Sequence, residues 1–84
     1  MSKAPPTDPY RLRKHSLMLD GHQTSVTLED AFWDELVAIA KRQGMSLNKV
    51  ATEIDHARTT NLSSALRVFV LNALKAKAAP NGGA

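Results

Sequence analysis

The chain of 84 residues contains no cysteine, only one Trp, one Tyr and two Phe, and no long apolar run. Without cysteine it can form neither a disulfide nor a cysteine-ligated zinc site. No segment approaches the roughly 18 consecutive apolar residues that a membrane-crossing helix requires. The residues after Met1 are polar and rich in proline, unlike the apolar segment of a secretory signal. These absences lead us to expect a cytoplasmic protein that does not bind to or span a membrane.

The histidines also give no sign of a metal site. No two of His15, His22 and His56 are spaced i, i+4, and no cysteine accompanies them, so neither a metal nor another cofactor is expected. A Ser-His-Asp set can be written from Ser63, His56 and Asp55. However, the glycines of a nucleophile elbow are missing, and a chain this short has little room for a cleft. Enzyme activity is therefore not expected.

The length of the chain and the distribution of its charge both suggest binding partners. A chain of this length buries only roughly 60–65% of its extended surface, and a partner chain is the simplest further source of stability. The net charge is +3 and is unevenly distributed. The first part of the chain holds an excess of cations, namely Lys3, Arg11, Arg13 and Lys14 against Asp8. A basic arm suits a polyanionic partner, although a solubilising tail explains the charge equally well.

Proline and glycine mark the two ends of the folded part. Residues 1–12 are polar, basic and proline-rich, and we expect them to form a disordered arm. The folded domain is expected to span residues 13–76. A flexible tail is expected over residues 77–84, which end in Pro-Asn-Gly-Gly-Ala.

Asp20-Gly21 predicts a β-hairpin, because it lies between two alternating segments and a type I′ turn needs positive φ at both central residues. A two-residue loop would pair Leu19 with His22, Leu17 with Thr24, His15 with Val26, and Arg13 with Leu28. One face of the hairpin is then apolar and comprises Leu17, Leu19, Val26 and Leu28. The other face is polar and comprises Lys14, Ser16, Met18, Gln23, Ser25 and Thr27.

Three helices are expected after the hairpin. Apolar residues at three- and four-residue steps predict the first over about 30–43, with Gly44 as a left-handed C-cap. The second begins with Ser46 as N-cap and ends near Arg58. The third spans roughly 63–75 and is apolar nearly all round, which suggests an interface. The expected fold class is α+β, mostly α.

Four segments together resemble a known family. They are Gly21-His22-x-Thr24-Ser25-Val26, Leu28-Glu29-x-x-Phe32-Trp33, Glu53-Ile54-Asp55, and Asn61-Leu62-Ser63-Ser64-Ala65-Leu66-Arg67. They resemble the ribbon-helix-helix (Arc/MetJ/CopG-like) DNA-binding proteins, and in particular a bacterial subfamily with an extra N-terminal hairpin strand and a third helix. The resemblance covers about residues 13–76.

The resemblance implies an intertwined homodimer. The strand before the first helix would pair antiparallel with its twin, and this ribbon would enter the major groove of double-stranded DNA. The residues implied to contact bases are Gln23, Ser25 and Thr27. Those implied to contact phosphates are Lys14, Ser46, Leu47, Asn48 and Lys49. The implied dimer core comprises Val26, Leu28, Trp33, Leu36, Leu47, Val50 and Ile54.

The chemistry of these residues fits the implied roles, although each has a simpler structural alternative. Gln can bind adenine through two hydrogen bonds, whereas an ordinary solvated strand face is the other interpretation of the polar trio. Free amides at the start of the second helix can bind an anion, whereas Ser46 could be a helix cap alone. The hairpin adds a geometric condition. If 13–19 occupies one edge of the readout strand, the other edge must stay free for dimer pairing.

Arg67 is expected to have a structural role. It interrupts an apolar helix, and a buried Arg needs a carboxylate partner, so we predict an ion pair with Glu53 or Asp55. A small-ligand site built on the same group is the alternative. Phe32 and Trp33 are interpreted as core residues rather than as a stacking platform.

Two functions therefore remain open. The first is a homodimeric, sequence-specific DNA-binding protein that acts as a transcriptional repressor. The second is a protein-interaction module, such as an antitoxin or adaptor, in which the same dimer docks another protein through the third helix.

Overall fold

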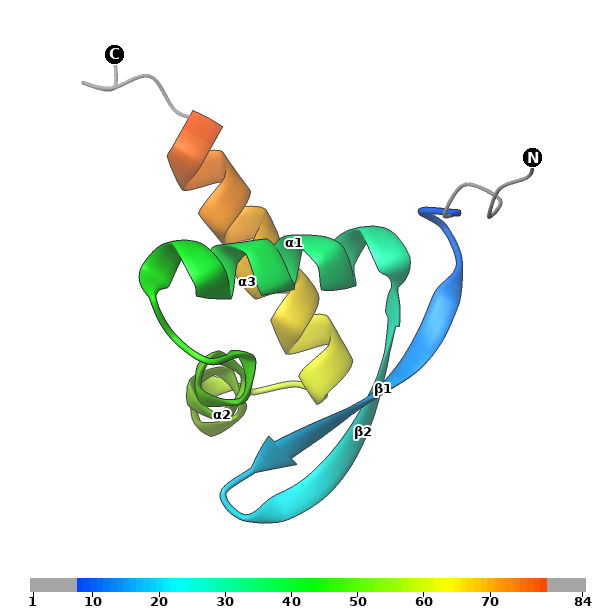
Figure 1. Cartoon of the computed structure of the whole chain (residues 1–84), viewed down its shortest axis with the longest axis vertical. Helices are drawn as coiled ribbons and strands as arrows, with labels where there is room; N and C mark the ends of the chain where they lie inside the picture. The colour runs from blue at the N-terminus through cyan, green and yellow to red at the C-terminus, as the bar shows by residue number, and fades with distance from the viewer. Residues whose placement is uncertain (1–7, 79–84) are drawn as a thin grey trace.

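The computed structural model describes residues 8–78, and these form two strands followed by three helices (Figure 1). The elements are β1 (Leu12–Leu19), β2 (His22–Glu29), α1 (Asp30–Gln43), α2 (Leu47–Ala57) and α3 (Leu62–Ala78). The two strands form one antiparallel sheet. The fold class expected from the sequence, α+β and mostly helical, is confirmed.

The hairpin has the predicted turn and the predicted register. Asp20 and Gly21 have φ values of 50° and 80°, which is the combination that a type I′ turn requires. Leu19 faces His22, and the pairing continues without a bulge to Leu12 and Glu29. A one-residue slip would move every apolar side chain to the solvent face, so the buried face fixes this register.

Both predicted caps are present in the helices that follow. Gly44 ends α1 in the left-handed conformation, and its N–H bonds to the carbonyls of Ala40 and Lys41. Ser46 precedes α2 in an extended conformation, and its hydroxyl accepts a hydrogen bond from the N–H of Lys49 at 3.1 Å. The short Gly44–Ser46 connection therefore ends one helix and begins the next.

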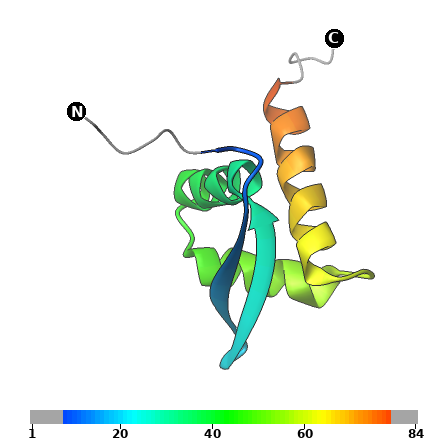
Figure 2. The ribbon, with the colours of Figure 1, turned by 90° about the vertical axis from the view of Figure 1, so that its right-hand side faces the viewer.

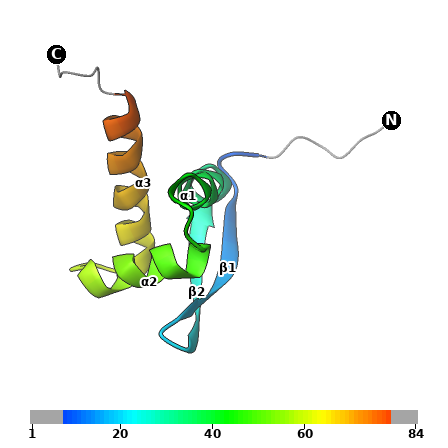
Figure 3. The same ribbon diagram turned by 60° about the vertical axis from the view of Figure 1, so that its left-hand side comes forward.

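The core lies between the apolar face of the hairpin and the three helices. Leu17, Leu19, Val26 and Leu28 of the hairpin are all buried. The helices add Leu36, Ile39, Ala40, Val50, Ala51, Leu62, Leu66 and Val70. Figures 2 and 3 show the helices gathered on one side of the hairpin, and the burial pattern makes this the apolar side. The polar face is left to solvent.

The third helix differs from its prediction in length. It begins one residue earlier than expected, at Leu62, and continues through Ala78, so residues 77 and 78 of the expected tail are helical. At the other end, residues 8–11 of the expected arm form a turn, in which the N–H of Arg11 bonds to the carbonyl of Asp8, and the arm's last residue, Leu12, begins β1. The remaining parts of the expected arm and tail, 1–7 and 79–84, lie outside the described residues.

The predicted partner of Arg67 was wrong. Arg67 Nε donates to Glu29 Oε1 at 2.9 Å, whereas Glu53 pairs with Lys49 and Asp55 with Arg58. The reason is the course of α3, whose first turns follow the end of β2. From Ser63 to Arg67 the helix rises about 6 Å, and from Thr27 to Glu29 the strand rises about 6.6 Å. Because the two rises are similar, Arg67 contacts Glu29 just as Ser63 contacts Thr27.

Candidate nucleic-acid interface

The solvent face of the hairpin is made by two strands of one chain and is mostly polar, with the exposed apolar side chains of Leu12 and Met18 at its two ends. Its side chains are all exposed and come in cross-strand pairs, Lys14 with Thr27, Ser16 with Ser25, and Met18 with Gln23. Gln23 Nε2 lies 3.5 Å from Ser16 Oγ, so the two strands already share a polar contact on this face. The three residues predicted to contact bases therefore lie side by side on an open surface.

Each outer edge of the hairpin meets a helix of the same chain. On β1, the backbone N–H of Met18 donates to Asn48 Oδ1 at 3.0 Å. On β2, the backbone carbonyl of Thr27 accepts from Ser63 Oγ at 3.1 Å. Neither contact was predicted, because each joins residues at least thirty positions apart and no local pattern indicates it.

The start of α2 lies beside the edge of β1, because Asn48 makes the contact with Met18 (Figure 3). The Ser46 hydroxyl accepts from Lys49 N–H, which leaves the amides of Leu47 and Asn48 for an outside acceptor. Such free amides, with the helix dipole behind them, favour an anion. The structure thus brings residues 46–49, which were predicted to contact phosphates, next to the face predicted to contact bases.

The cations near this surface have different partners. Arg13 pairs with the buried carboxylate of Asp30 at 3.2 Å, and Lys49 lies 3.8 Å from Glu53 in an exposed i, i+4 pair. Lys14 is exposed and takes part in none of the ion pairs formed within residues 8–78. Lys14 is therefore the cation on the hairpin face that is most readily available to a phosphate.

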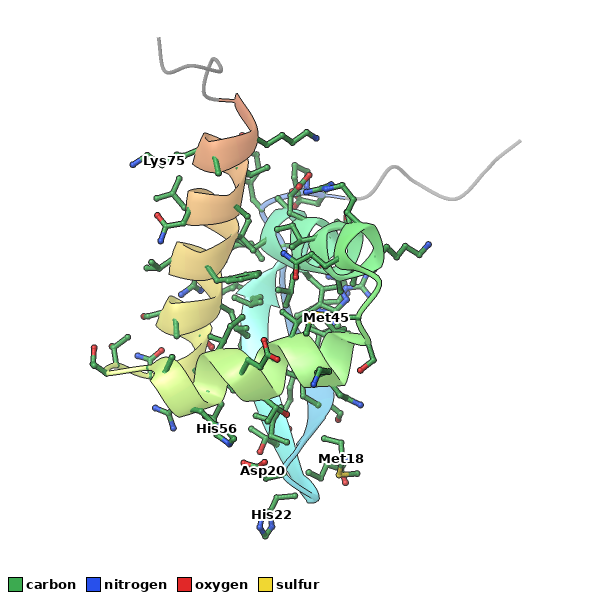
Figure 4. All side chains as sticks on the ribbon, turned by 90° about the vertical axis from the view of Figure 1, so that its left-hand side faces the viewer. Met18, Asp20, His22, Met45, His56 and Lys75 are labelled. Carbon is green, nitrogen blue, oxygen red and sulfur yellow. The ribbon has the colours of Figure 1, made fainter. Side chains whose placement is uncertain are left out.

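The hairpin tip is tied to α2 by a second contact that the sequence did not predict. His56 Nε2 lies 2.6 Å from Asp20 Oδ2, and Figure 4 shows the two side chains approaching each other between α2 and the turn. The hydrogen bond that the imidazole donates to the Asp20 carboxylate raises the pKa of His56 above its usual value. The pair holds the tip of the hairpin against the helix.

At the other end of the hairpin, His15 stacks on Trp33. The two rings are 3.7 Å apart and nearly parallel, with an angle of 7° between them. Burial lowers the pKa of His15, and the neighbouring Arg13 adds to this effect. Trp33 is thus partly buried against the core, and its ring supports β1 rather than a ligand.

The α2–α3 groove is a second surface, on the helical side of the molecule. It is an open, largely apolar hollow of about 350 Å³, lined by Ile54, Ala57, Arg58, Thr59, Thr60, Ala65, Val68, Phe69 and Asn72. Val68 at its wall is 53% exposed, so it adds apolar surface to the hollow that faces solvent. This groove is a candidate surface for another protein chain.

The residues implied to form a dimer core divide into two sets. Val26, Leu28, Leu36 and Val50 are buried by the chain's own side chains. Trp33, Leu47 and Ile54 are partly buried, and of these Ile54 lines the α2–α3 groove. The role of the seven residues in a dimer stays a prediction.

The residues of the Ser-His-Asp set have three different partners. Ser63 donates to the Thr27 carbonyl, His56 contacts Asp20, and Asp55 accepts from Arg58 at 2.7 Å. Within residues 8–78, no three His, Asp or Glu side chains are grouped as metal ligands would be. In the same part of the chain, none of the helices combines the length and apolar character needed to cross a membrane.

The fold and this surface agree with the family that the sequence resembles. A family model for the ribbon-helix-helix domain matches residues 12–74, which is most of the chain. The chain belongs to this family, whose members are DNA-binding regulators that generally act as dimers.

One solved structure is similar to the chain along most of its length. It is that of an uncharacterized protein from Bordetella pertussis Tohama I, with 33% sequence identity and a TM-score of 0.68. The match covers 87% of this chain, and this chain spans 65% of the length of that protein's chain. No curated protein matches the chain.

Proposed function

We propose that the protein is a bacterial, cytoplasmic, homodimeric regulator that binds specific DNA sequences and represses transcription, without enzyme activity. The observation that carries this proposal is the hairpin, which presents an exposed polar face while its other face is fixed in the core. A major groove is wide enough for a two-stranded β-ribbon, and alternate side chains of such a ribbon can reach the edges of the bases.

The side chains on that face have suitable chemistry for reading bases. Gln23 can bind adenine through its amide oxygen and nitrogen, and Ser25 and Thr27 can donate to or accept from several bases. None of the three carries the guanidinium that most often reads guanine, so we expect a preference for sites in which adenine lies opposite Gln23.

Phosphate contacts would position the ribbon. The amides of Leu47 and Asn48 lie at the start of α2, which contacts β1 at Met18, and Lys14 of β1 and Lys49 of α2 are exposed cations. Contacts of this kind supply affinity and fix the register of the protein on the duplex, but they carry no sequence information.

The second chain of the dimer would occupy the α2–α3 groove. Isolated small domains have marginal cores, and this groove exposes Val68 and part of Phe69 to water. A second copy of the same face would cover these side chains.

Fluorescence anisotropy with a labelled duplex tests the proposal. The logarithm of the affinity should fall linearly with the logarithm of salt concentration, by about 0.9 per phosphate neutralised. Lys49→Ala should reduce this slope, whereas Lys75→Ala removes the same charge from the far end of α3 and should not (Figure 4). Gln23→Ala should change the sequences recovered from a random pool. Equal affinity of wild type, Lys49→Ala and Gln23→Ala at all salt concentrations would contradict the site.

The second candidate function is a protein-interaction module of the antitoxin or adaptor kind. The α2–α3 groove favours it, since an apolar hollow of this kind could equally hold a helix of another protein. A wild-type protein that shows no salt-dependent binding to DNA, but co-purifies with a stoichiometric partner released by Val68→Asp, would move the conclusion to this function.

A further inference from the structure

The solvent face of the hairpin carries an apolar side chain beside a residue that we expect to contact bases. Met18 is 48% exposed and lies opposite Gln23 across the two strands. The next pair on this face, Ser16 with Ser25, is polar. Single exposed apolar residues are common on protein surfaces, so the important feature of Met18 is its position next to Gln23.

The position of Met18 is fixed by the elements on both sides of it. The bond from Asp30 N–H to the Arg11 carbonyl sets the alternation along the hairpin, and it makes Met18 and Gln23 a pair without mutual hydrogen bonds. In such a pair the two Cβ atoms lie only about 4.5–5.5 Å apart. On the other side, the N–H of Met18 donates to Asn48 Oδ1 at 3.0 Å. The side chain of Met18 therefore projects from a held backbone.

The amide of Gln23 does not cover this side chain. Its Nε2 lies 3.5 Å from Ser16 Oγ, and Ser16 is the neighbour of Met18 on the same face of β1. Figure 4 shows Met18 near the tip of the hairpin, where this face ends. A ligand that contacts the Gln23 amide therefore finds an exposed thioether side chain one strand away, at a spacing of about 4.8 Å.

An A·T base pair offers matching groups in the major groove. Adenine presents one donor and one acceptor, which a glutamine side chain can bind together. Thymine presents a methyl group, which no other DNA base carries on its major-groove edge. Methionine is long, flexible and polarizable, so it adapts its shape to a small apolar group. Gln23 and Met18 together thus fit adenine and thymine.

We propose that Met18 contacts the methyl group of a thymine, at or next to the A·T pair that Gln23 reads. Met18 is then a specificity-determining residue supplied by β1, in addition to the polar side chains of β2. The assignment does not depend on which strand lies along the outer edge of β2, because β1 occupies the opposite edge. The inference rests on the proposed DNA-binding function and adds a thymine to the sequence that the surface recognises.

Replacing thymine with deoxyuridine tests the contact, because deoxyuridine lacks only the methyl group. Each thymine of a selected duplex is replaced in turn, and the affinity is measured by fluorescence anisotropy. Wild type should bind roughly three- to fivefold more weakly when the thymine beside the adenine read by Gln23 is replaced, as expected for one methyl group that is no longer buried. That adenine is the one for which Gln23→Ala loses its preference. Met18→Ala should bind the thymine and deoxyuridine duplexes equally.

Two further variants serve as controls. Leu12 is 55% exposed at the far end of the same face, so Leu12→Ala removes a similar side chain and should keep the discrimination against deoxyuridine. Met18→Leu should keep it as well, because leucine has a similar volume and no charge. All three variants should fold, since both side chains are exposed and Asn48 binds the backbone rather than the side chain of Met18.

The possible results separate this inference from the proposed function. If wild type binds DNA but tolerates deoxyuridine at every position, or if Met18→Ala still discriminates against it, the inference is overturned and the proposed function stands. If wild type shows no salt-dependent binding to any duplex, both are contradicted. Discrimination that is lost in Met18→Ala and kept in Leu12→Ala supports the inference.

Discussion

The contact between His56 and Asp20 links the hairpin tip to α2 through an ionisable imidazole. Both side chains are more than half exposed, at 61% and 52%. The carboxylate raises the pKa of His56 in the folded protein above its value in the unfolded chain. The stabilisation is therefore fully present below the unfolded pKa of about 6.5 and is lost as the pH rises through the folded pKa.

We predict that Asp20→Asn lowers the pKa of His56 towards about 6.5. Asn also suits the first central position of a type I′ turn, so the hairpin should persist. The measurement is the pH titration of the His56 imidazole proton shifts by NMR. The His15 signals are an internal control, because burial lowers the pKa of that residue independently of Asp20. An unchanged His56 titration would show that the pair does not form in solution.

At the residue scale, the sequence identified exposed and buried positions better than it identified partners. The alternation in 13–28 and the Asp-Gly turn predicted which side chains of the hairpin face solvent. The partner of Arg67 was predicted wrongly, since two acidic residues on α2 suit an arginine as well as Glu29 does. Only the path of α3 along β2 decides between them, and this path depends on packing that no local pattern contains.

The junction between α1 and α2 depends on the conformation of one glycine. Gly44 has a φ of 68°, and an added Cβ would meet no atom within 4 Å. Any cost of Gly44→Ala would therefore come from the left-handed backbone alone, about 1–2 kcal/mol. We predict a loss of unfolding free energy of this size in urea titrations. A loss near zero would indicate that the α1–α2 connection relaxes into another conformation.

The packing of α3 into the chain's own core can be tested by comparing two leucines of that helix. Leu66 is fully buried, whereas Leu71 is 50% exposed. Leu66→Ala should reduce the free energy of unfolding by about 2–5 kcal/mol, as expected for the truncation of a buried leucine. Leu71→Ala is the matched control and should cost far less. Similar losses for both would contradict the position of α3.

At the element scale, the sequence predicted the strands, the turn and the first two helices because each has its own local signal. These signals are period-two alternation, a glycine with positive φ, and a serine N-cap. The end of α3 had no such signal, since its last turn consists of alanine and lysine and both continue a helix readily. The order in which helices cover the edges of the hairpin was not predictable from any single segment.

At the scale of the whole molecule, the proposed DNA surface and the apolar groove belong to different parts of the chain. The first is formed by the hairpin and the start of α2, and the second by the end of α2 and by α3. A dimer formed through the groove would leave both ribbons available for DNA. Strand pairing, in contrast, would use the outer edge of β2, where Ser63 of α3 contacts the Thr27 carbonyl.

We predict that Val68→Asp raises the dimer dissociation constant roughly tenfold or more, because it would bury an unpaired charge at the centre of the interface. The substitution should leave the protomer folded, since Val68 is 53% exposed. Light scattering across a dilution series measures the effect. Ala31→Asp, which adds the same charge at an exposed position at the start of α1, is the control. A Val68→Asp protein that stays dimeric at all concentrations would exclude the groove as the interface.

The central claim is that the solvent face of one chain's hairpin, together with the start of α2, binds DNA. The most direct measurement is an NMR titration of the ¹⁵N-labelled protein with a duplex that carries a selected site. We expect the amide shifts to concentrate in residues 14–27 and 46–49, on both β1 and β2, with little change in α3. Shifts confined to α2 and α3 around the groove, or no shifts at low salt, would contradict the claim.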